Sequence, residues 1–301
     1  NIVKHKKKLI TETPVTLNIP QWLKNNILRY FDNNTLKLIA EKIVTEPFTD
    51  IYVKSKLIND NDWEKTLGGN FIFGNVLRLK KNDKIEKLPY FSDGHWWVQG
   101  LSATFPVKIF NEIYGKRIKN QISLLDVGSA PGGKTFQLLD YGYNVSSLEI
   151  SKRRIVTLKK NSQRTKFKTS IINDDFTSYK HKSKFDSILI DAPCSGSGLI
   201  QKKPEILVQK KDLTKLLQKQ KLMLRNCSKN LKKNGYIIYS VCSIHSDEGQ
   251  NQIESFLNEN KNFTIESPFK EIKKFKKKTK SPFFITTPDM VKKGSIFVHR
   301  Q

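Results

Sequence analysis

The second half of this chain alternates short apolar runs with amphipathic segments, and this pattern restricts the possible folds more than any other feature. The apolar runs, each long enough for one strand, cover residues 122–127, 144–150, 167–172, 185–190 and 235–242. Strands that alternate with helices build a parallel sheet from βαβ units. With two last strands expected at residues 282–286 and 294–298, the sequence predicts a Rossmann-like α/β fold with a mostly parallel, seven-stranded sheet.

Two helices are expected late in the chain. Residues 212–233 place leucines and Cys227 on one helical face, so we expect Cys227 to be a buried packing residue. Ser246, followed by Asp247 and Glu248, has the pattern of an N-cap with an acidic first turn, and it predicts a helix that runs to about Asn258.

The residues before the sheet predict smaller parts. Residues 20 to about 45 have apolar side chains at helical spacing, and residues 48–106 hold short β-like runs that end in Trp96 and Trp97. We expect both tryptophans to pack in a core, because that is commoner than a base-stacking role. The expected organisation is a basic segment over residues 1–19, a small α+β domain over 20–105 and the α/β domain over 106–301.

The charge of the chain favours a polyanionic partner. There are 54 Lys and Arg residues against 28 Asp and Glu residues in a chain of 301, a net charge of +26. Such an excess attracts nucleic acid, although a general enrichment in lysine produces the same excess. Two dense runs, Lys4–Lys8 and Lys273–Lys280, are either RNA contacts or solvated loops.

Several classes of protein are excluded by what the sequence lacks. No apolar run reaches the length of a membrane-spanning helix, and the first ten residues lack the apolar stretch of a signal peptide. We therefore expect a soluble, cytoplasmic protein with no membrane partner. Three cysteines without a CxxC pair argue against a disulfide framework and against a structural zinc site, so no metal is expected.

The loop after the first predicted strand matches two templates. Gly128, Gly133, Lys134 and Thr135 have the spacing of a phosphate-binding P-loop, and Asp191 at the end of a later strand would then help to hold Mg²⁺. That interpretation predicts an ATPase or an RNA helicase-like protein.

The same loop also has the spacing of a nucleotide-binding turn between a strand and a helix, Asp126-x-Gly128-x-Ala130-x-Gly132. This second template expects an acidic residue at the end of the next strand, where Glu149 stands, and a polar residue after the third strand, where Asp174 stands. Carboxylates repel a triphosphate and favour a cationic sulfonium. The sequence therefore favours S-adenosylmethionine over ATP among four carboxylates, Asp126, Glu149, Asp174 and Asp191.

Two cysteines follow strands of the predicted sheet. Cys194 lies three residues after Asp191, and Cys242 ends the fifth strand. The carboxyl ends of parallel strands form the edge where ligands bind, so both thiols and the carboxylate are expected in one crevice. This set suits methylation at carbon 5 of a pyrimidine. A thiolate adds to C6, C5 takes the methyl group, a base removes the C5 proton, and the aspartate bonds N3.

These motifs resemble the RNA cytosine-5 methyltransferases of the Sun/NOP2 type, and most of all the bacterial 16S ribosomal RNA methyltransferase B branch. The resemblance extends from about residue 20 to the end and is carried by residues 96–99, 130–135, 191–198, 239–243 and 248–249. It implies that Cys242 attacks C6, that Cys194 assists proton removal and product release, and that Asp191 contacts the base. It implies contacts with S-adenosylmethionine from Gly128, Ser129, Ala130, Pro131, Gly132, Gly133, Lys134, Glu149, Asp174 and Asp191.

The resemblance further implies RNA, and specifically 16S rRNA, as the partner of a monomeric enzyme whose residues up to about 105 bind RNA. In longer members of the family a helical NusB-like domain would precede Asn1. The sequence departs from the family's pattern at Gly128-Ser129 (Cys-Ala), Glu149 (Asp), Gly100 (an acidic residue) and residues 201–205 (Arg-Arg-His-Pro-Asp). The last departure leaves the target nucleotide open.

Three alternatives stay open, and one hypothesis concerns reactivity. The alternatives are the P-loop ATPase, a DNA cytosine-5 methyltransferase in which Cys194 is the nucleophile, and a non-catalytic RNA-binding assembly factor. Reactivity requires that Cys242 ionise near neutral pH. We hypothesise that the positive RNA-binding face and Lys134 lower its pKa.

Overall fold

The computed structural model describes residues 16, 19–81, 84–115, 117–209, 212–266, 284–285 and 297–300. Both lysine runs and most of the expected segment 1–19 lie outside these ranges, as do the ends of the two last expected strands. Within them, no helix is both long and apolar enough to cross a bilayer.

The large sheet has seven strands in the order β10-β11-β9-β8-β5-β6-β7. The five strands from β5 to β9 are parallel, and β10 and β11 join one edge antiparallel. This confirms the predicted mostly parallel, seven-stranded sheet. The strands are β5 (Ser123–Val127), β6 (Asn144–Leu148), β7 (Ser170–Ile172), β8 (Phe185–Asp191), β9 (Leu231–Val241), β10 (Phe284–Ile285) and β11 (Phe297–Arg300).

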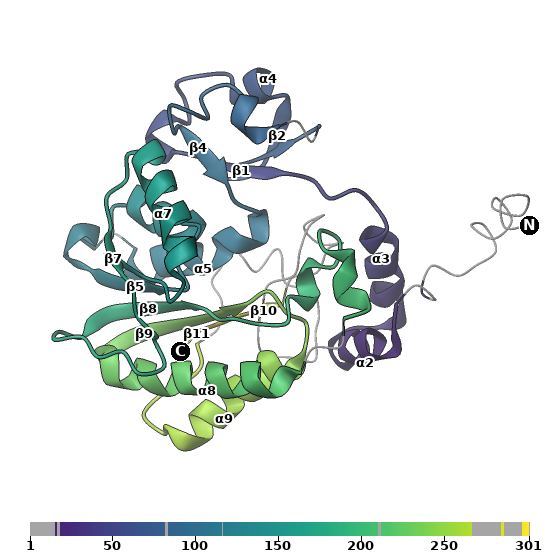
Figure 1. The fold of residues 1–301 in the computed structure, drawn as a ribbon, viewed down its shortest axis with the longest axis vertical. Helices are drawn as coiled ribbons and strands as arrows, with labels where there is room; N and C mark the ends of the chain where they lie inside the picture. The colour runs from purple at the N-terminus through teal and green to yellow at the C-terminus, as the bar shows by residue number, and fades with distance from the viewer. Residues whose placement is uncertain are drawn as a thin grey trace, which may run out of the picture.

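Helices cover both faces of this sheet (Figure 1). On one face lie α5 (Leu101–Tyr114), α6 (Gly133–Asp140) and α7 (Lys152–Thr165), and on the other lie α8 (Leu213–Asn230) and α9 (Gln250–Glu259). Alternation along β8 feeds both faces, because Ile188 and Ile190 pack with α8 while Leu189 packs with α5 and α6. Cys227 is fully buried in the α8 face, which confirms its predicted packing role.

Three expected boundaries were wrong. Strand β7 begins at Ser170 because Phe167 leaves the sheet and packs its ring against Trp97 and Phe136. Helix α8 ends at Asn230, so the lysines at 232 and 233 belong to β9. Ser246 does not cap a long helix. It begins the 3-10 turn Ser246–Glu248, and its hydroxyl accepts a hydrogen bond from Arg29.

A small antiparallel sheet precedes the large one, in the order β2-β3-β1-β4. Trp96 and Trp97 are buried as predicted, and the Trp97 ring stacks on Tyr52 with a centroid distance of 4.8 Å. The expected boundary at residues 105 and 106 falls inside α5, and the division into two domains stays a prediction. The elements are β1 (Asp50–Val53), α4 (Trp63–Leu67), β2 (Gly69–Phe73), β3 (Val76–Leu79) and β4 (Trp96–Val98).

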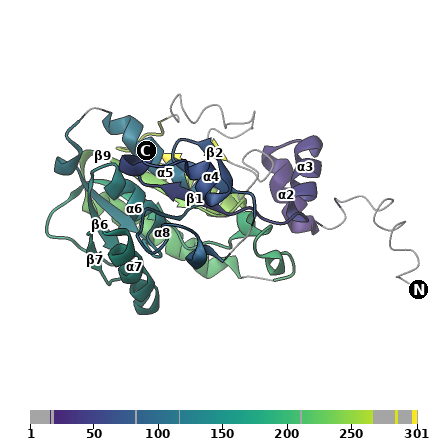
Figure 2. The ribbon, with the colours of Figure 1, turned by 90° about the horizontal axis from the view of Figure 1, so that it is seen from above.

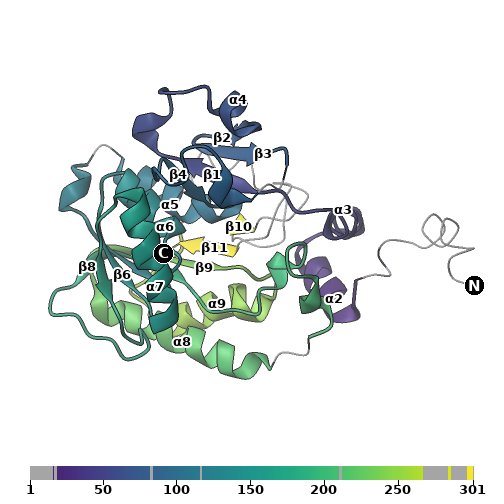
Figure 3. The same ribbon diagram turned by 45° about the horizontal axis from the view of Figure 1, so that its top comes forward.

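Two N-terminal helices, α2 (Gln21–Tyr30) and α3 (Asn33–Ile43), lie apart from the small sheet in Figures 2 and 3. They pack beside the loop that follows β9, where Trp22 stacks on His245 at a centroid distance of 5.0 Å. Short 3-10 helices complete the described chain at Ser55–Leu57, Ile85–Lys87, Lys119–Gln121, Ser197–Leu199, Pro204–Leu207 and Ser246–Glu248.

Candidate active site

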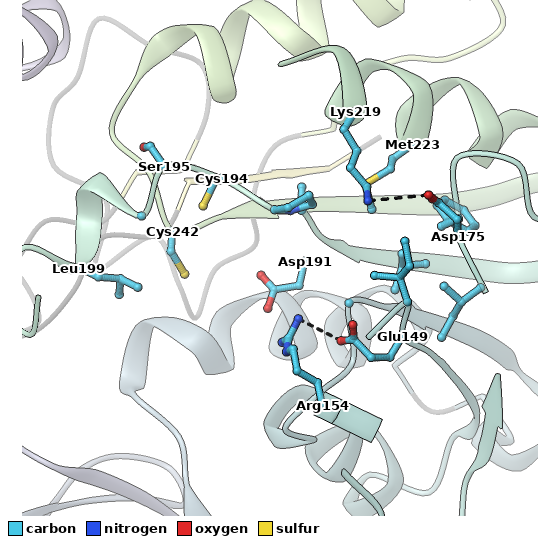
Figure 4. A pocket seen from close by; sticks show the side chains of 18 of the residues that line it. Glu149, Arg154, Asp175, Asp191, Cys194, Ser195, Leu199, Lys219, Met223 and Cys242 are labelled. Atoms are coloured by element: carbon cyan, nitrogen blue, oxygen red, sulfur yellow. Dashed lines mark ion pairs between the residues drawn. The ribbon is translucent and has the colours of Figure 1, made fainter. Parts of the chain in front are cut away.

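A cavity of about 470 Å³ opens at the carboxyl edge of the parallel strands. Figure 4 shows the two cysteines toward one end, Asp191 in the middle, and Glu149 and Asp175 toward the other end. Residues separated by more than a hundred positions thus face one space, as the strand-end argument predicted. The predicted site residues that line it are Gly128, Glu149, Asp174, Asp191, Cys194 and Cys242.

The loop between β5 and α6 has a conformation that requires glycine. Gly128 has a φ of +79°, and a Cβ atom there would lie 2.6 Å from the carbonyl oxygen of Asp191. Gly132 has a φ of +113° at the N-cap of α6, where a Cβ atom would collide with the Phe136 ring at 2.3 Å. The N–H of Gly128 donates to the carbonyl of Leu148 at 2.9 Å, which ties the loop to β6.

The other predicted loop residues take supporting positions. Among the described residues that line the cavity, Gly128 is the sole member of the loop, so the predicted cofactor contacts of the remaining loop residues stay predictions. They are Ser129, Ala130, Pro131, Gly132, Gly133 and Lys134.

The side chains of Lys134 and Thr135 argue against the P-loop interpretation. A P-loop lysine reaches phosphates and its threonine hydroxyl binds Mg²⁺. Here Lys134 Nζ lies 2.6 Å from Asp191 Oδ2, and the fully buried Thr135 Oγ1 donates to Asp126 Oδ2 at 2.5 Å. Both side chains therefore hold carboxylates inside the protein. Burial raises the pKa of Asp126 to about 6, although the Thr135 hydrogen bond lowers it.

Glu149 presents a buried carboxylate to the cavity. Arg154 lies 3.0 Å from its Oε2 atom, and the N–H of Ser151 donates to Oε1 at 2.9 Å. Arg154 also donates to the carbonyl oxygen of Ala130, so one guanidinium bridges the cofactor loop and Glu149. The sequence analysis missed Arg154, since a basic residue on the exposed first turn of a helix carries no signal of its own.

The far wall holds a second ion pair that sequence reasoning missed. Lys219 of α8 lies 3.8 Å from Asp175, and both side chains line the cavity beside the exposed Asp174. Met223, one turn further along α8, also lines the cavity. The spacing of Lys219 and Met223 on α8 could have indicated a shared face, but the strand-end pattern alone could not place that face against the site.

Cys194 and Cys242 are half-buried, and Figure 4 shows both at the same end of the cavity. Burial raises the pKa of Cys242 to about 11, and the Asp191 carboxylate raises it further, while Lys134 and Lys202 act in the opposite direction. The hypothesis of a lowered pKa was therefore wrong for the free protein. Desolvation exceeds the effect of the nearby lysines.

Cys194 is also held as a thiol. Burial raises its pKa well above the ordinary range, and the charges of Cys242 and Glu248 act in the same direction. Glu248 is a third residue that sequence reasoning missed as a functional group, since it entered only as part of a family motif. It is completely buried and accepts hydrogen bonds from the residues that follow each cysteine, Ser195 and Ser243.

No metal-binding cluster is present in the part of the chain that the structure describes, where no three His, Cys, Asp or Glu side chains are grouped to hold an ion.

Comparison with known proteins identifies the family. A family model described as 16S rRNA methyltransferase RsmB/F matches residues 116–300. The chain belongs to the RsmB/F family. This membership confirms the resemblance drawn from the glycine loop and the two cysteine motifs.

Curated relatives of this RsmB/F chain have the name ribosomal RNA small subunit methyltransferase B. The protein of Photorhabdus laumondii is 36% identical over 189 residues, which cover 60% of this chain and 43% of the relative. That of Cronobacter sakazakii is 29% identical over 252 residues, which cover 79% and 57%. The chain thus spans about half the length of the curated relatives it matches.

Two solved structures show the same fold as this RsmB/F chain. NSun6 from Pyrococcus horikoshii, solved with SFG, gives a TM-score of 0.75 at 16% identity and covers 93% of this chain and 97% of the other. A methyltransferase homologue from the same organism gives a TM-score of 0.71 at 21% identity over 98% and 97%. The predicted Rossmann-like fold is confirmed.

Proposed function

We propose that this protein methylates carbon 5 of a cytosine in 16S ribosomal RNA with S-adenosylmethionine as methyl donor. The observation that carries the proposal is the convergence of two thiols and a carboxylate, Cys194, Cys242 and Asp191, on the cavity that the glycine loop enters. Membership of the RsmB/F family supports ribosomal RNA as the substrate. The proposal places the enzyme in the cytoplasm, acting as a monomer whose residues before the large sheet bind RNA.

The donor set of the cavity fits S-adenosylmethionine. Gly128 leaves room where a Cβ atom would collide, and Glu149 offers a buried carboxylate that Arg154 orients. Glu149 would accept from ribose hydroxyls, while Asp174 and Asp191 would offset a positive charge. When bound, S-adenosylmethionine supplies an electrophilic methyl group on a sulfonium. The NSun6 structure with SFG, an analogue of S-adenosylmethionine, supports this assignment.

The thiol of Cys242 is the nucleophile of the proposed mechanism. Its sulfur bonds to C6 of the cytosine as its proton passes, through Asp191, to N3 of the ring. The electron pair displaced from the C5–C6 double bond then makes C5 nucleophilic. Transfer of that proton to N3 also removes the negative charge next to Cys242, which is one cause of its raised pKa. Substrate binding thus favours ionisation of a thiol that the free protein keeps protonated.

Cys194 completes the reaction after C5 is methylated. Its thiolate takes the C5 proton, the C5–C6 double bond forms again, and the C6–S bond breaks, so that Cys242 leaves as a thiolate. The N3 proton returns to Asp191. Because burial raises the pKa of Cys194, its thiolate holds a proton strongly once formed, as a base for this step must.

A trapping experiment tests this division of roles. The wild-type protein and its Cys194→Ala, Cys242→Ala and Cys227→Ala forms are incubated with S-adenosylmethionine and 16S rRNA. Covalent protein–RNA adducts are then measured on a denaturing gel, and 5-methylcytosine by mass spectrometry of nucleosides. We expect an adduct with Cys194→Ala, none with Cys242→Ala, and wild-type behaviour from Cys227→Ala, whose thiol lies in the core.

Other outcomes would favour the other candidates. An adduct that depends on Cys194 and forms without Cys242 would indicate the arrangement of a DNA cytosine-5 methyltransferase. RNA binding without any methyl transfer by the wild-type protein would indicate an assembly factor. Methyl transfer that survives both substitutions would refute the two-cysteine mechanism.

A further inference from the structure

Glu248 joins the two cysteine loops through one buried carboxylate. It ends the 3-10 turn after the Cys242 loop, and its side chain has no exposed surface. Its Oε1 atom accepts from the N–H of Ser195 at 2.7 Å, and its Oε2 atom accepts from Ser195 Oγ and Ser243 Oγ, both at 2.5 Å. Each serine directly follows one of the two cysteines.

Further hydrogen bonds surround this connection. Gln220 of α8 donates to Glu248 Oε1 at 3.3 Å and to the carbonyl of Pro193 at 2.9 Å. Ser197 Oγ lies 2.9 Å from Ser243 Oγ, and the N–H of residue 198 donates to the carbonyl of Cys242 at 3.1 Å. The loops therefore contact each other at several points, but Glu248 is the charged centre of the network. Charge-assisted bonds of this kind are stronger than neutral ones.

The Glu248 carboxylate acts differently on the two thiols. It is one cause of the raised pKa of Cys194. The charges that act most on Cys242 are instead Asp191 and the lysines at 134, 202 and 203. A buried carboxylate that is bonded to both loops but charges one thiol environment is suited to fixing where Cys194 stands while Cys242 is bonded to the substrate.

We propose that Glu248 is a positioning residue that locks the Cys194 loop to the Cys242 loop and so places Cys194 to remove the C5 proton. This role rests on the function proposed above. If it holds, loss of Glu248 delays resolution of the covalent adduct more than its formation.

Glu248→Gln is the variant of choice, because the amide keeps the shape of the side chain and replaces one acceptor oxygen with a donor. The matched control is Asp247→Asn, which removes the neighbouring exposed carboxylate, bonded to Asn251. With 16S rRNA and S-adenosylmethionine, we expect Glu248→Gln to accumulate covalent adduct and to lose about tenfold in kcat, with KM for RNA within about twofold. Asp247→Asn should match the wild type.

The Cys194→Ala background separates positioning from general damage. There, Glu248→Gln should add no further adduct, because the residue through which it acts is gone. Ser195→Ala, which removes one hydroxyl donor and keeps the backbone N–H, should reproduce part of the adduct accumulation if the larger change proves too destabilising. Additive effects in the double variant, or loss of activity without adduct, would overturn the proposal.

Thiol alkylation in the absence of RNA distinguishes failure of this inference from failure of the proposed function. We expect Glu248→Gln to move the pH profile of Cys194 alkylation to lower pH and to leave that of Cys242 in place, followed by mass spectrometry of each cysteine peptide. That result would stand even if the wild-type protein methylated no RNA. Unchanged profiles, or equal shifts at both cysteines, would show that Glu248 does not position Cys194.

Discussion

Substitution of Gly128 by alanine tests how closely the cofactor loop and the catalytic strand are packed. The left-handed φ of +79° costs a residue with a Cβ atom about 1–2 kcal/mol. The added atom would lie 2.6 Å from the Asp191 carbonyl oxygen, whereas real Cβ contacts under 3.0 Å essentially do not occur, so the two segments must separate by at least 0.4 Å. Overpacking of this kind costs about 1–3 kcal/mol. We therefore expect Gly128→Ala to lower the free energy of unfolding by about 2–5 kcal/mol.

Gly142→Ala is the matched control for this substitution. Gly142 also has a positive φ, +89°, but a Cβ atom there would meet nothing within 4 Å, so only the backbone cost of about 1–2 kcal/mol applies. Urea unfolding measures both losses, and calorimetry measures the affinity for S-adenosylmethionine. We expect the affinity to fall in Gly128→Ala alone, because the displaced Asp191 lines the cavity. Equal losses of stability in the two variants, or an unchanged affinity in Gly128→Ala, would refute the reasoning.

Three further predictions follow from charge and packing. Lys134→Ala removes a cation that lowers the pKa of Cys242, so alkylation of Cys242 at pH 8 should slow by about tenfold, and an unchanged rate would contradict the assignment. Because burial raises the pKa of Asp126 to about 6, the native state holds that proton more tightly than the unfolded chain does. The free energy of unfolding should fall by about 3 kcal/mol as pH rises from about 4 to 7, and Asp126→Asn should flatten this dependence in urea titrations. Trp22→Ala removes the ring stacked on His245 and should slow adduct formation several-fold with no change in affinity for S-adenosylmethionine; a parallel loss of that affinity would count against a local effect on this loop.

The sequence predicts the layout of the site because strand ends obey a simple geometric rule. Glu149, Asp191, Cys194 and Cys242 each lie at or just after the carboxyl end of a strand, and parallel strands bring those ends together whatever the rest of the chain does. The rule needs only the period of the apolar pattern. For this reason the fold and the convergence of these residues could be predicted together.

The remaining features depend on contacts that no local pattern encodes. Phe167 has the apolar character of a strand residue, yet its ring is used between Trp97 and Phe136. The high pKa of Cys242 results from burial by several elements, which outweighs the lysines that the sequence displays. Glu248 has the pattern of a first-turn acid, but its hydrogen bonds reach a serine more than fifty positions away. Side chains of this kind are assigned only when the packed structure is known.

The N-terminal helices share one apolar core with the catalytic sheet. Leu23 and Ile27 of α2 belong to the same buried cluster as Ile190 of β8 and Cys227 of α8. Segments that share a core lose their packing together, so thermal unfolding of α2 and α3 should coincide with that of the sheet in one cooperative transition. An enzyme built in this way cannot release its N-terminal helices to search for RNA while the catalytic sheet stays intact. It meets its substrate with the Cys242 loop already clamped.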